Sequence, residues 1–402
     1  MKKAPSPIVS LIPIIVLVLL LFATIRTFGS DALSGGSQVS LLTTTAICIL
    51  IGMVFYKIPW KDYELAITNN IAGVATAIII LLIIGALSGI WVISGVVPTL
   101  IYYGMQIIHP SFFLASTCII CALISVMTGS SWTTIATIGI ALMGIGKAQG
   151  FEDGWIAGAI ISGAYFGDKI SPLSETTILA SSITDTPLFR HIRYMMITTV
   201  PSLVITLIIF TVAGFSHDAN NTQHIAEVAT ALNEKFHITP WLLIVPVATG
   251  ILIAKKVPSI VTLFLSTLLA AVFALIFQPD LLEEISGIAA SGFDSLFKGL
   301  MMTIYGETNL HTDNAVLTDL IATRGMSGMM NTIWLILCPM CFGGAMTASG
   351  MVGSITSIFV RFMKKTVSVV SATVCSGLFL NLTTADQYIS IILTGNMFRD
   401  IY

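Results

Sequence analysis

The sequence predicts an all-α polytopic membrane protein, and three observations lead to this class. Of the 402 residues, 55% are hydrophobic and only 9% are charged, whereas a soluble domain carries about a quarter charged residues. The mean hydropathy is +0.95. Several apolar runs approach the roughly 20 residues that a helix needs to cross a bilayer. They are continuous rather than alternating, as in Ile14–Phe22 and Ile78–Ile84, which excludes the strands of an outer-membrane barrel.

Candidate membrane spans follow one another along the whole chain, and no low-complexity linker separates a second, soluble domain. We therefore treat 1–402 as a single transmembrane domain. The spans cover roughly 8–26, 39–56, 71–90, 92–108, 112–127, 135–147, 154–167, 178–187, 192–214, 240–254, 257–277, 331–348, 351–361, 366–381 and 388–402. Trp60–Ala72 and Glu283–Met302 are less apolar and are predicted as interfacial helices or short connectors, and His217–Thr239 is predicted as a loop.

Basic residues set the predicted orientation because they prefer cytoplasmic loops. Lys2 and Lys3 place the N-terminus in the cytoplasm. The apolar run after them is predicted to stay as an anchor, since no small-residue cleavage site follows it. The later loops then alternate between the two sides of the membrane in a consistent way. The basic residues predicted on the cytoplasmic side are Lys57, Lys61, Arg190, Arg193, Lys255, Lys256, Arg361, Lys364 and Lys365.

A first predicted helix break lies at Thr128–Thr134, where small hydroxyl residues crowd between two apolar half-spans. Backbone polar groups cannot stay unpaired in lipid, so a helix broken at membrane depth must face protein, water or an ion. Hydroxyl and freed carbonyl oxygens are hard ligands that suit Na⁺-type cations. The alternative is a Ser/Thr-rich packing motif between helices.

A second break is predicted within Phe166–Thr177, which reads FGDKISPLSETT. An ionisable group inside a transmembrane region is costly and indicates a functional site by default. Pro172 removes a backbone donor and disfavours helix at the residue before it, so the helix should stop and restart near Thr177. Asp168 at this break can bind a cation when ionised and carry a proton when neutral. An ordinary ion pair of Asp168 with Lys169 at a membrane surface is the alternative.

A third break is predicted at Asn381–Gln387, again a hydroxyl-containing stretch before an apolar half-helix. Aligned on Thr137 and Ser390, it matches the first break in pattern. Corresponding interruptions in two halves of a transporter point to a binding site near the bilayer midplane. We predict two repeats, roughly 71–214 and 240–402, with Thr384 and Asp386 as second-repeat counterparts of the first site.

Three stretches resemble the NhaC family of Na⁺/H⁺ antiporters, namely Thr128–Leu142, Gly163–Ala180 and Thr318–Met351. The resemblance extends over most of the chain from about Gly73. It implies a secondary transporter of the bacterial inner (plasma) membrane, within the broad ion-transporter superfamily. Such folds use inverted repeats, each with a re-entrant hairpin and a broken helix. Some relatives exchange malate and protons for lactate and Na⁺.

The chain departs from the family at its end. The first repeat continues past its break, whereas the second stops at Tyr402, a half-helix after its break. The family resemblance implies a further hairpin and a last span. The expectation is therefore that the chain is truncated or that its second half is abbreviated.

The resemblance also implies which residues bind the ion or substrate. These are Ser130, Ser131, Thr133, Thr134, Asp168, Ser174, Glu175, Thr176, Thr384 and Asp386. Among them, Na⁺ is assigned to Ser131, Thr134, Asp168 and Glu175. Asp168 is the first choice for the carboxylate that titrates, followed by Glu175 and Asp386. Three charged residues lie near the third stretch, Asp313, Asp319 and Arg324. They are expected either to line the transport pathway or to have a loop or interfacial role.

The leading hypothesis is a secondary active transporter, not an enzyme, that exchanges Na⁺ for H⁺ by alternating access without a cofactor. Its partners are Na⁺, H⁺ and the lipid bilayer, and no basic block indicates nucleic acid. The alternative is a Na⁺- or H⁺-coupled exchanger of small carboxylates. An intramembrane aspartyl protease built on Asp168 and Asp386 is disfavoured, since the chain has no Tyr-Asp dipeptide. The oligomeric state stays open, including a homo-oligomer.

The six cysteines give no strong signal of a metal or redox site. Two pairs have C-x-x-C spacing, Cys118 with Cys121 and Cys338 with Cys341. Both pairs lie in apolar runs and lack the polar context of a zinc ribbon. We predict that they are packing residues in transmembrane helices.

Overall fold

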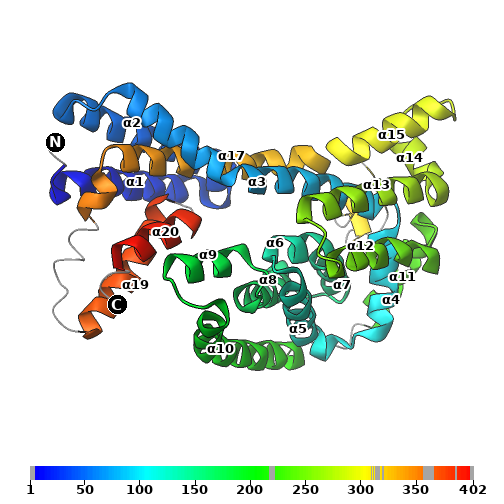
Figure 1. Cartoon of the computed structure of the whole chain (residues 1–402). Helices are drawn as coiled ribbons and strands as arrows, with labels where there is room; N and C mark the ends of the chain where they lie inside the picture. The colour runs from blue at the N-terminus through cyan, green and yellow to red at the C-terminus, as the bar shows by residue number, and fades with distance from the viewer. Residues whose placement is uncertain are drawn as a thin grey trace. The chain divides into compact units, whose positions relative to one another are not determined.

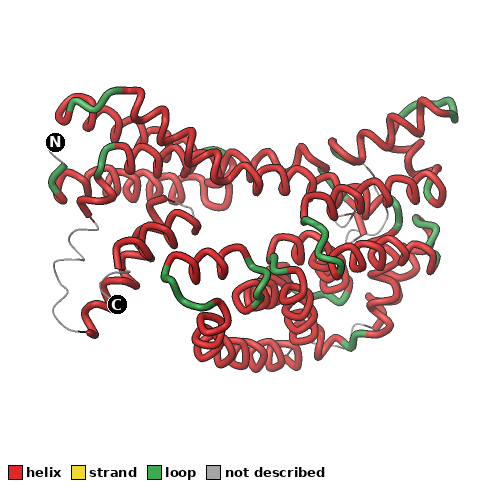
Figure 2. Tube along the Cα trace, in the orientation of Figure 1, coloured by secondary structure: helices red, strands yellow, loops and turns green. Residues whose placement is uncertain are grey.

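A computed structural model describes residues 5–216, 222–308, 310, 312, 317–318, 321–355, 366–384 and 387–398, and its regular structure there is helical throughout (Figures 1 and 2). No strand occurs in these ranges. The predicted all-α class is confirmed.

Seven helices in the described ranges are long and apolar enough to cross a membrane, which confirms a polytopic membrane protein. They are α1 (Pro7–Phe28), α2 (Gly36–Tyr56), α3 (Trp60–Ile93), α5 (Pro110–Thr128), α10 (Leu188–Ser216), α13 (Ser259–Phe277) and α17 (Gly325–Ala348). Most predicted spans fall on these helices or on shorter ones between them.

The other helices are shorter or less apolar. They are α4 (Val96–Ile107), α6 (Ser131–Thr134), the π-helical turn η2 (Ile135–Gly139), α7 (Ile140–Ala148), α8 (Asp153–Ile170), α9 (Glu175–Ile183), α11 (Thr222–Lys235), α12 (Ile244–Ala254), α14 (Pro279–Ser286), α15 (Phe293–Tyr305), α19 (Thr366–Thr384) and α20 (Gln387–Phe398). Two 3₁₀ turns, Gly29–Ser34 and Pro240–Leu243, precede α2 and α12.

The prediction of a separate connector at Trp60–Ala72 is wrong, because these residues form the start of the 34-residue helix α3. The stretch contains no glycine or proline that would end a helix. Its polar residues Lys61, Asp62 and Glu64 reduce the hydropathy without interrupting the helical backbone.

The prediction of a loop at His217–Thr239 is wrong for the part that forms α11 (Thr222–Lys235). The segment was predicted as a loop because it lies between two apolar spans, and its acidic charge was used only to predict the side of the membrane. Val228, Leu232 and Phe236 recur every four residues and are buried, which is the apolar stripe of an amphipathic helix. The loop prediction did not take this periodicity into account.

The chain divides into two compact units, 1–78 with 182–185 and 330–402, and 79–181 with 186–329. The first unit has its core on α2 and α17, where Cys48, Phe342 and Met346 are buried. The Cys48 sulfur lies 3.7 Å from the sulfurs of Met346 and Met351. The two predicted sequence repeats are a separate matter and remain a prediction.

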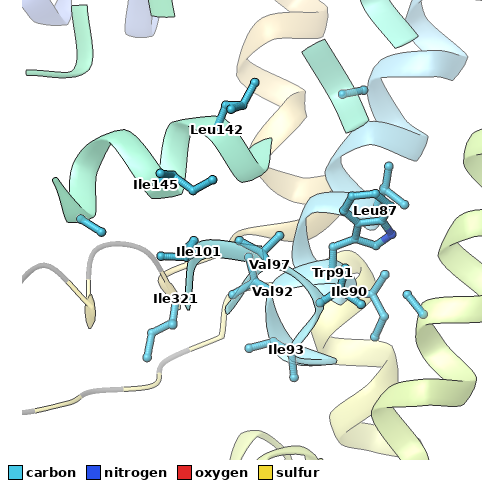
Figure 3. Packing of buried hydrophobic residues seen from close by; sticks show 14 of the residues in the cluster. Leu87, Ile90, Trp91, Val92, Ile93, Val97, Ile101, Leu142, Ile145 and Ile321 are labelled. Carbon is cyan, nitrogen blue, oxygen red and sulfur yellow. The ribbon is translucent and has the colours of Figure 1, made fainter. Parts of the chain in front are cut away.

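The second unit has its core where α3 and α4 meet α7 and the segment before α17. Figure 3 shows Ile321 of that segment beside Ile101 and Val92. Two hydrogen bonds fold the segment back on itself, from Thr308 N to Thr323 O (2.9 Å) and from Thr308 Oγ1 to Ile321 O (3.0 Å). This anchors the residues that immediately precede α17.

Helices α5 and α8 of the second unit pack closely against each other (Figure 1). Gly163 and Gly167 of α8, four residues apart, form the contact, the spacing of small residues that lets two helix backbones approach. A Cβ at Gly163 would overlap the Cys118 carbonyl oxygen, and a Cβ at Gly167 would lie 2.5 Å from the Ala122 carbonyl oxygen. The two helices run in the same direction, so their C-terminal ends lie together.

Cys118 and Cys121, the first C-x-x-C pair, are buried in this contact. The Cys121 Cβ would lie 2.9 Å from a Cβ at Gly163. The predicted packing role of this pair is confirmed.

We expect Gly163→Ala to lower the free energy of unfolding by about 1–3 kcal/mol, because the added methyl group overpacks a backbone contact. The change is measured as a shift of the thermal unfolding midpoint of the purified protein in detergent. Gly158→Ala is the matched control on the same helix, where a Cβ would meet only Phe210 at 3.9 Å. Equal midpoints for the two variants would show that α5 and α8 do not pack as described.

Candidate ion-binding site

The first predicted break is confirmed, since α5 ends at Thr128 and a new helix begins at Ser131. Gly129 takes a left-handed conformation (φ +67°), which glycine adopts at little cost. Ser130 is extended and caps the new helix, its hydroxyl accepting the backbone N–H of Thr133 (3.2 Å). The helix then continues through α6, η2 and α7 to Ala148.

The second predicted break is also confirmed, between Ile170 at the end of α8 and Glu175 at the start of α9. Ser171 is extended (φ −72°, ψ 130°), as expected for a residue before proline. The Ser174 hydroxyl accepts the N–H of Thr177 (3.4 Å), and the Thr177 hydroxyl donates to the Lys169 carbonyl oxygen (3.0 Å). Side-chain hydroxyls thus satisfy backbone groups that the break exposes.

The two breaks meet each other, although almost 40 residues separate them. The Ser131 hydroxyl donates a hydrogen bond to Asp168 Oδ2 (3.0 Å). The Ser171 hydroxyl donates to the Val126 carbonyl oxygen (2.8 Å) near the end of α5. Gly129 lies against Leu173, so that a Cβ there would be 2.6 Å from the Leu173 carbonyl carbon. The structure therefore brings Asp168 and Ser131, both predicted site residues, into direct contact.

The other hydroxyls of the first break bond mainly within it. Thr133 is buried and its hydroxyl donates to Ser130 Oγ (3.1 Å), while the buried Thr134 donates to the Ser130 carbonyl oxygen (3.0 Å). A hydroxyl that donates its hydrogen still has oxygen lone pairs to offer. Asp168 is half-buried. The site therefore presents a carboxylate and several hydroxyl oxygens, the hard donors that Na⁺ prefers.

The second break contributes Ser174 and Thr176, whose hydroxyls lie 3.0 Å apart. Ser174 is fully buried. These two predicted residues lie on the chain just after the loop that contacts Gly129. Within the described part of the chain, the hydrogen bonds of Ser174 and Thr176 do not include Asp168.

The structure describes the remaining predicted site residues only in part or not at all. Glu175 is the first residue of α9 and Thr384 the last of α19, and for both the backbone alone is described. Asp386, Asp313 and Asp319 lie outside the described residues. The proposed counterpart site in a second repeat therefore stays a prediction.

The alternative of an Asp168–Lys169 ion pair finds no support. Lys169 is exposed, and within the described ranges the side-chain partner of Asp168 is Ser131. Consecutive residues of a helix point in different directions, so neighbours in sequence do not face each other.

Sequence reasoning predicted that the glycines at the end of α8 allow close packing, but it did not identify α5 as the partner helix or Ser171 as a residue that joins the two breaks. The small-residue spacing at 163 and 167 was the signal for the close packing. The contact of Ser171 with the Val126 carbonyl oxygen depends on a pairing of elements that local sequence does not specify.

Comparisons with known proteins identify the family of the chain. The family model described as the Na⁺/H⁺ antiporter family matches residues 163–402. The Na⁺/H⁺ antiporter NhaC of Bacillus subtilis is 35% identical over 363 residues, which cover 90% of this chain and 77% of that protein. The malate-2H⁺/Na⁺-lactate antiporter of the same organism is 36% identical over 367 residues, 91% of this chain and 75% of that protein.

A more distant relative is named for a different exchange activity. The arginine/ornithine antiporter ArcD of Halobacterium salinarum is 30% identical over 404 residues, which cover 100% of this chain and 79% of that protein. The matched model spans more than half of the chain and includes Asp168. The resemblance predicted from the sequence is confirmed, and the chain belongs to the Na⁺/H⁺ antiporter family.

Proposed function

We propose that this protein exchanges Na⁺ for H⁺ across the bacterial inner (plasma) membrane by alternating access, as a transporter and not an enzyme. One observation carries the proposal, the hydrogen bond from Ser131 to Asp168 where two helix breaks meet. Family membership supports it, as do two relatives at 35% identity that are both named Na⁺/H⁺ antiporter NhaC.

Competition for one carboxylate explains the exchange. An ionised Asp168 needs a partner of positive charge, because an uncompensated charge in a weakly solvated site is costly. Na⁺ satisfies this need by binding the Asp168 and Ser131 oxygens, and a proton satisfies it by neutralising the carboxylate. Since the two ions use the same group, one leaves as the other binds. The cycle uses no cofactor.

Further ligands complete the proposed Na⁺ site. Thr134 lies three residues after Ser131 on the same helix, and its hydroxyl oxygen is buried near the break. Glu175 stands at the start of α9, directly after the loop that contacts Gly129. We propose both as Na⁺ ligands, with Ser130, Thr133, Ser174 and Thr176 around them, and with Thr384 and Asp386 as their second-repeat counterparts.

A second candidate is coupled exchange of small carboxylates. It is favoured by a specific observation, a cavity in the second unit whose lining includes Lys147 and Arg324. One relative at 36% identity is named a malate-2H⁺/Na⁺-lactate antiporter. In this candidate, Na⁺ would move protons only when an organic acid is present.

We expect Asp168→Asn to abolish Na⁺-dependent proton movement, because an amide can neither take up a proton nor carry the charge that binds Na⁺. The measurement uses vesicles with reconstituted protein, an imposed pH gradient and a pH dye inside. NaCl is added alone, then with malate or lactate. Asp294→Asn, the same change on an exposed side chain of α15, is the control and should behave as wild type. An active Asp168→Asn variant would remove Asp168 from the mechanism.

We expect Ser131→Ala to raise the Na⁺ concentration that gives half-maximal proton movement by at least about tenfold, since a hydrogen bond to a charged group contributes about 1.5–3 kcal/mol. The variant loses both a Na⁺ ligand and the group that orients Asp168. The same vesicles, titrated with NaCl, give this value. Ser162→Ala on α8 is the control. If both variants need the same Na⁺ concentration as wild type, Ser131 does not bind the ion.

A further inference from the structure

Three sulfur atoms meet in the core of the first unit, between α2 and the end of α17. The Cys48 sulfur lies 3.7 Å from the Met346 sulfur and 3.7 Å from the Met351 sulfur. All three side chains are completely buried. Cys48 and Met346 are 298 positions apart in the chain, so tertiary packing alone creates this sulfur cluster.

The backbone at the end of α17 brings the two methionines together. Met346 lies in the last turn of α17, and Gly350 then takes a left-handed conformation (φ +71°). Glycine adopts this conformation at little cost, and it ends a helix and redirects the chain. Met351 follows at once and begins the helical residues 351–355. The Ser349 hydroxyl donates to the Met346 carbonyl oxygen (2.9 Å), which holds the turn in place.

The cluster has more acceptors than protons. A thiol has one proton to donate, and a thioether can only accept. Cys48 therefore satisfies one of the two thioethers at a time, and the Ser349 hydroxyl, 3.8 Å from its sulfur, competes for the same thiol. Among the described contacts, one thioether is thus left with lone pairs that no proton of the cluster engages.

A buried tyrosine hydroxyl lies beside the cluster. The Tyr63 side chain is completely buried, and its hydroxyl has no hydrogen-bond partner among the described residues. A Cβ at Gly52 would overlap this hydroxyl oxygen. Gly52 and Cys48 are four residues apart and share a face of α2, and Tyr63 is close enough to Cys48 for the two groups to interact electrostatically. A buried hydroxyl without a partner is costly, which indicates that a charged or polar group belongs next to it.

The chemistry of the three sulfur ligands selects a soft, monovalent metal ion. Thiolate and thioether sulfurs are soft ligands, which favour Cu(I) over hard ions such as Mg²⁺. Of the three, Cys48 is the one that can carry a charge, as a thiolate. A monovalent ion on one thiolate is neutral, whereas a divalent ion would leave a positive charge uncompensated in a buried apolar place. The set therefore fits Cu(I) or its chemical analogue Ag(I).

The spacing of the sulfurs agrees with such an ion. Metal–thiolate bonds are about 2.3 Å long, so two sulfurs of a trigonal or tetrahedral site lie about 3.8–4.0 Å apart. The two distances of 3.7 Å are close to this range. Thr347 is exposed and Gly350 half-exposed, so the turn after α17 offers a short path from the surface. Sulfurs in simple packing contact lie at a similar distance, and binding itself therefore has to be measured.

We propose that Cys48, Met346 and Met351 bind one soft monovalent metal ion of the Cu(I) class, with the Tyr63 hydroxyl beside it. The Cys48 thiol loses its proton to water as the metal–sulfur bond forms, and the oxidation state of the metal does not change. The bound ion joins α2 to the end of α17 and so stabilises the first unit. The proposal is independent of Na⁺/H⁺ exchange, because Ser131 and Asp168 belong to the second unit.

Binding is tested on the full chain in detergent and chloride-free buffer, by titration with silver nitrate against free methionine as a competitor. We expect the wild type to bind one Ag(I) ion that Cys48→Ser loses. Met346→Leu and Met351→Leu conserve side-chain volume. Each should weaken this binding by at least about tenfold, since even outer-shell groups around a metal contribute 10–100-fold.

Two matched controls separate this site from other sulfur groups. Met330→Leu makes the same change on an exposed side chain of α17, and Cys375→Ser removes an exposed thiol of α19. Both should keep the ion that Cys48→Ser loses. Silver held by other cysteines does not respond to a change of Met346 or Met351, so a loss in those variants identifies the thioethers as ligands.

Two further measurements distinguish a lost ligand from a folding defect. One equivalent of silver should raise the thermal unfolding midpoint of the wild type and of Met330→Leu, but not of Cys48→Ser, whose midpoint without silver reports its folding. X-ray absorption of the wild type with one equivalent of Cu(I) should show three sulfurs at about 2.3 Å. The proposal is overturned if Met346→Leu and Met351→Leu bind silver as tightly as Met330→Leu, or if Cys48→Ser loses no ion. The cluster would then be a packing contact only.

Discussion

The close approach of α5 and α8 is the constraint on which the candidate site depends. Because Gly163 and Gly167 allow the backbones to touch and the helices run in the same direction, both helices end at the same place. Asp168 directly follows Gly167, and Ser131 begins the helix that follows α5. Their contact is therefore a consequence of backbone packing. A side chain at either glycine would separate the two ends and with them the two breaks.

The hydroxyl residues that crowd the two breaks serve the backbone as well as the site. Ser130 caps a helix, Ser174 accepts the N–H of Thr177, and Ser171 bonds a carbonyl oxygen of α5. Each of these satisfies a backbone group that would otherwise stay unpaired. Richness in Ser and Thr is thus a signature of the break itself, and the particular ligand set depends on which hydroxyls meet Asp168, as Ser131 does.

Local sequence was enough to predict both breaks, since glycine, proline and ionisable residues in apolar surroundings have strong and specific effects on a helix. It was not enough where two signals disagreed. In α11, the polar composition of a segment between two apolar spans favoured a loop, whereas the apolar spacing of Val228, Leu232 and Phe236 favoured a helix. The meeting of Lys147 with Arg324 at one cavity could not be predicted either, because the residues are far apart in the chain and only tertiary packing brings them together.

The π-helical turn at Ile135–Gly139 gives a physical route between the candidate ion site and the cavity. Such turns replace the usual backbone hydrogen bonds with a wider, rarer pattern and occur often at functional sites. This one begins four residues after Ser131, which bonds Asp168, and its own Ile135 and Gly139 line the cavity. Conversion of the turn to α-helix would rotate Ser131 relative to the cavity wall.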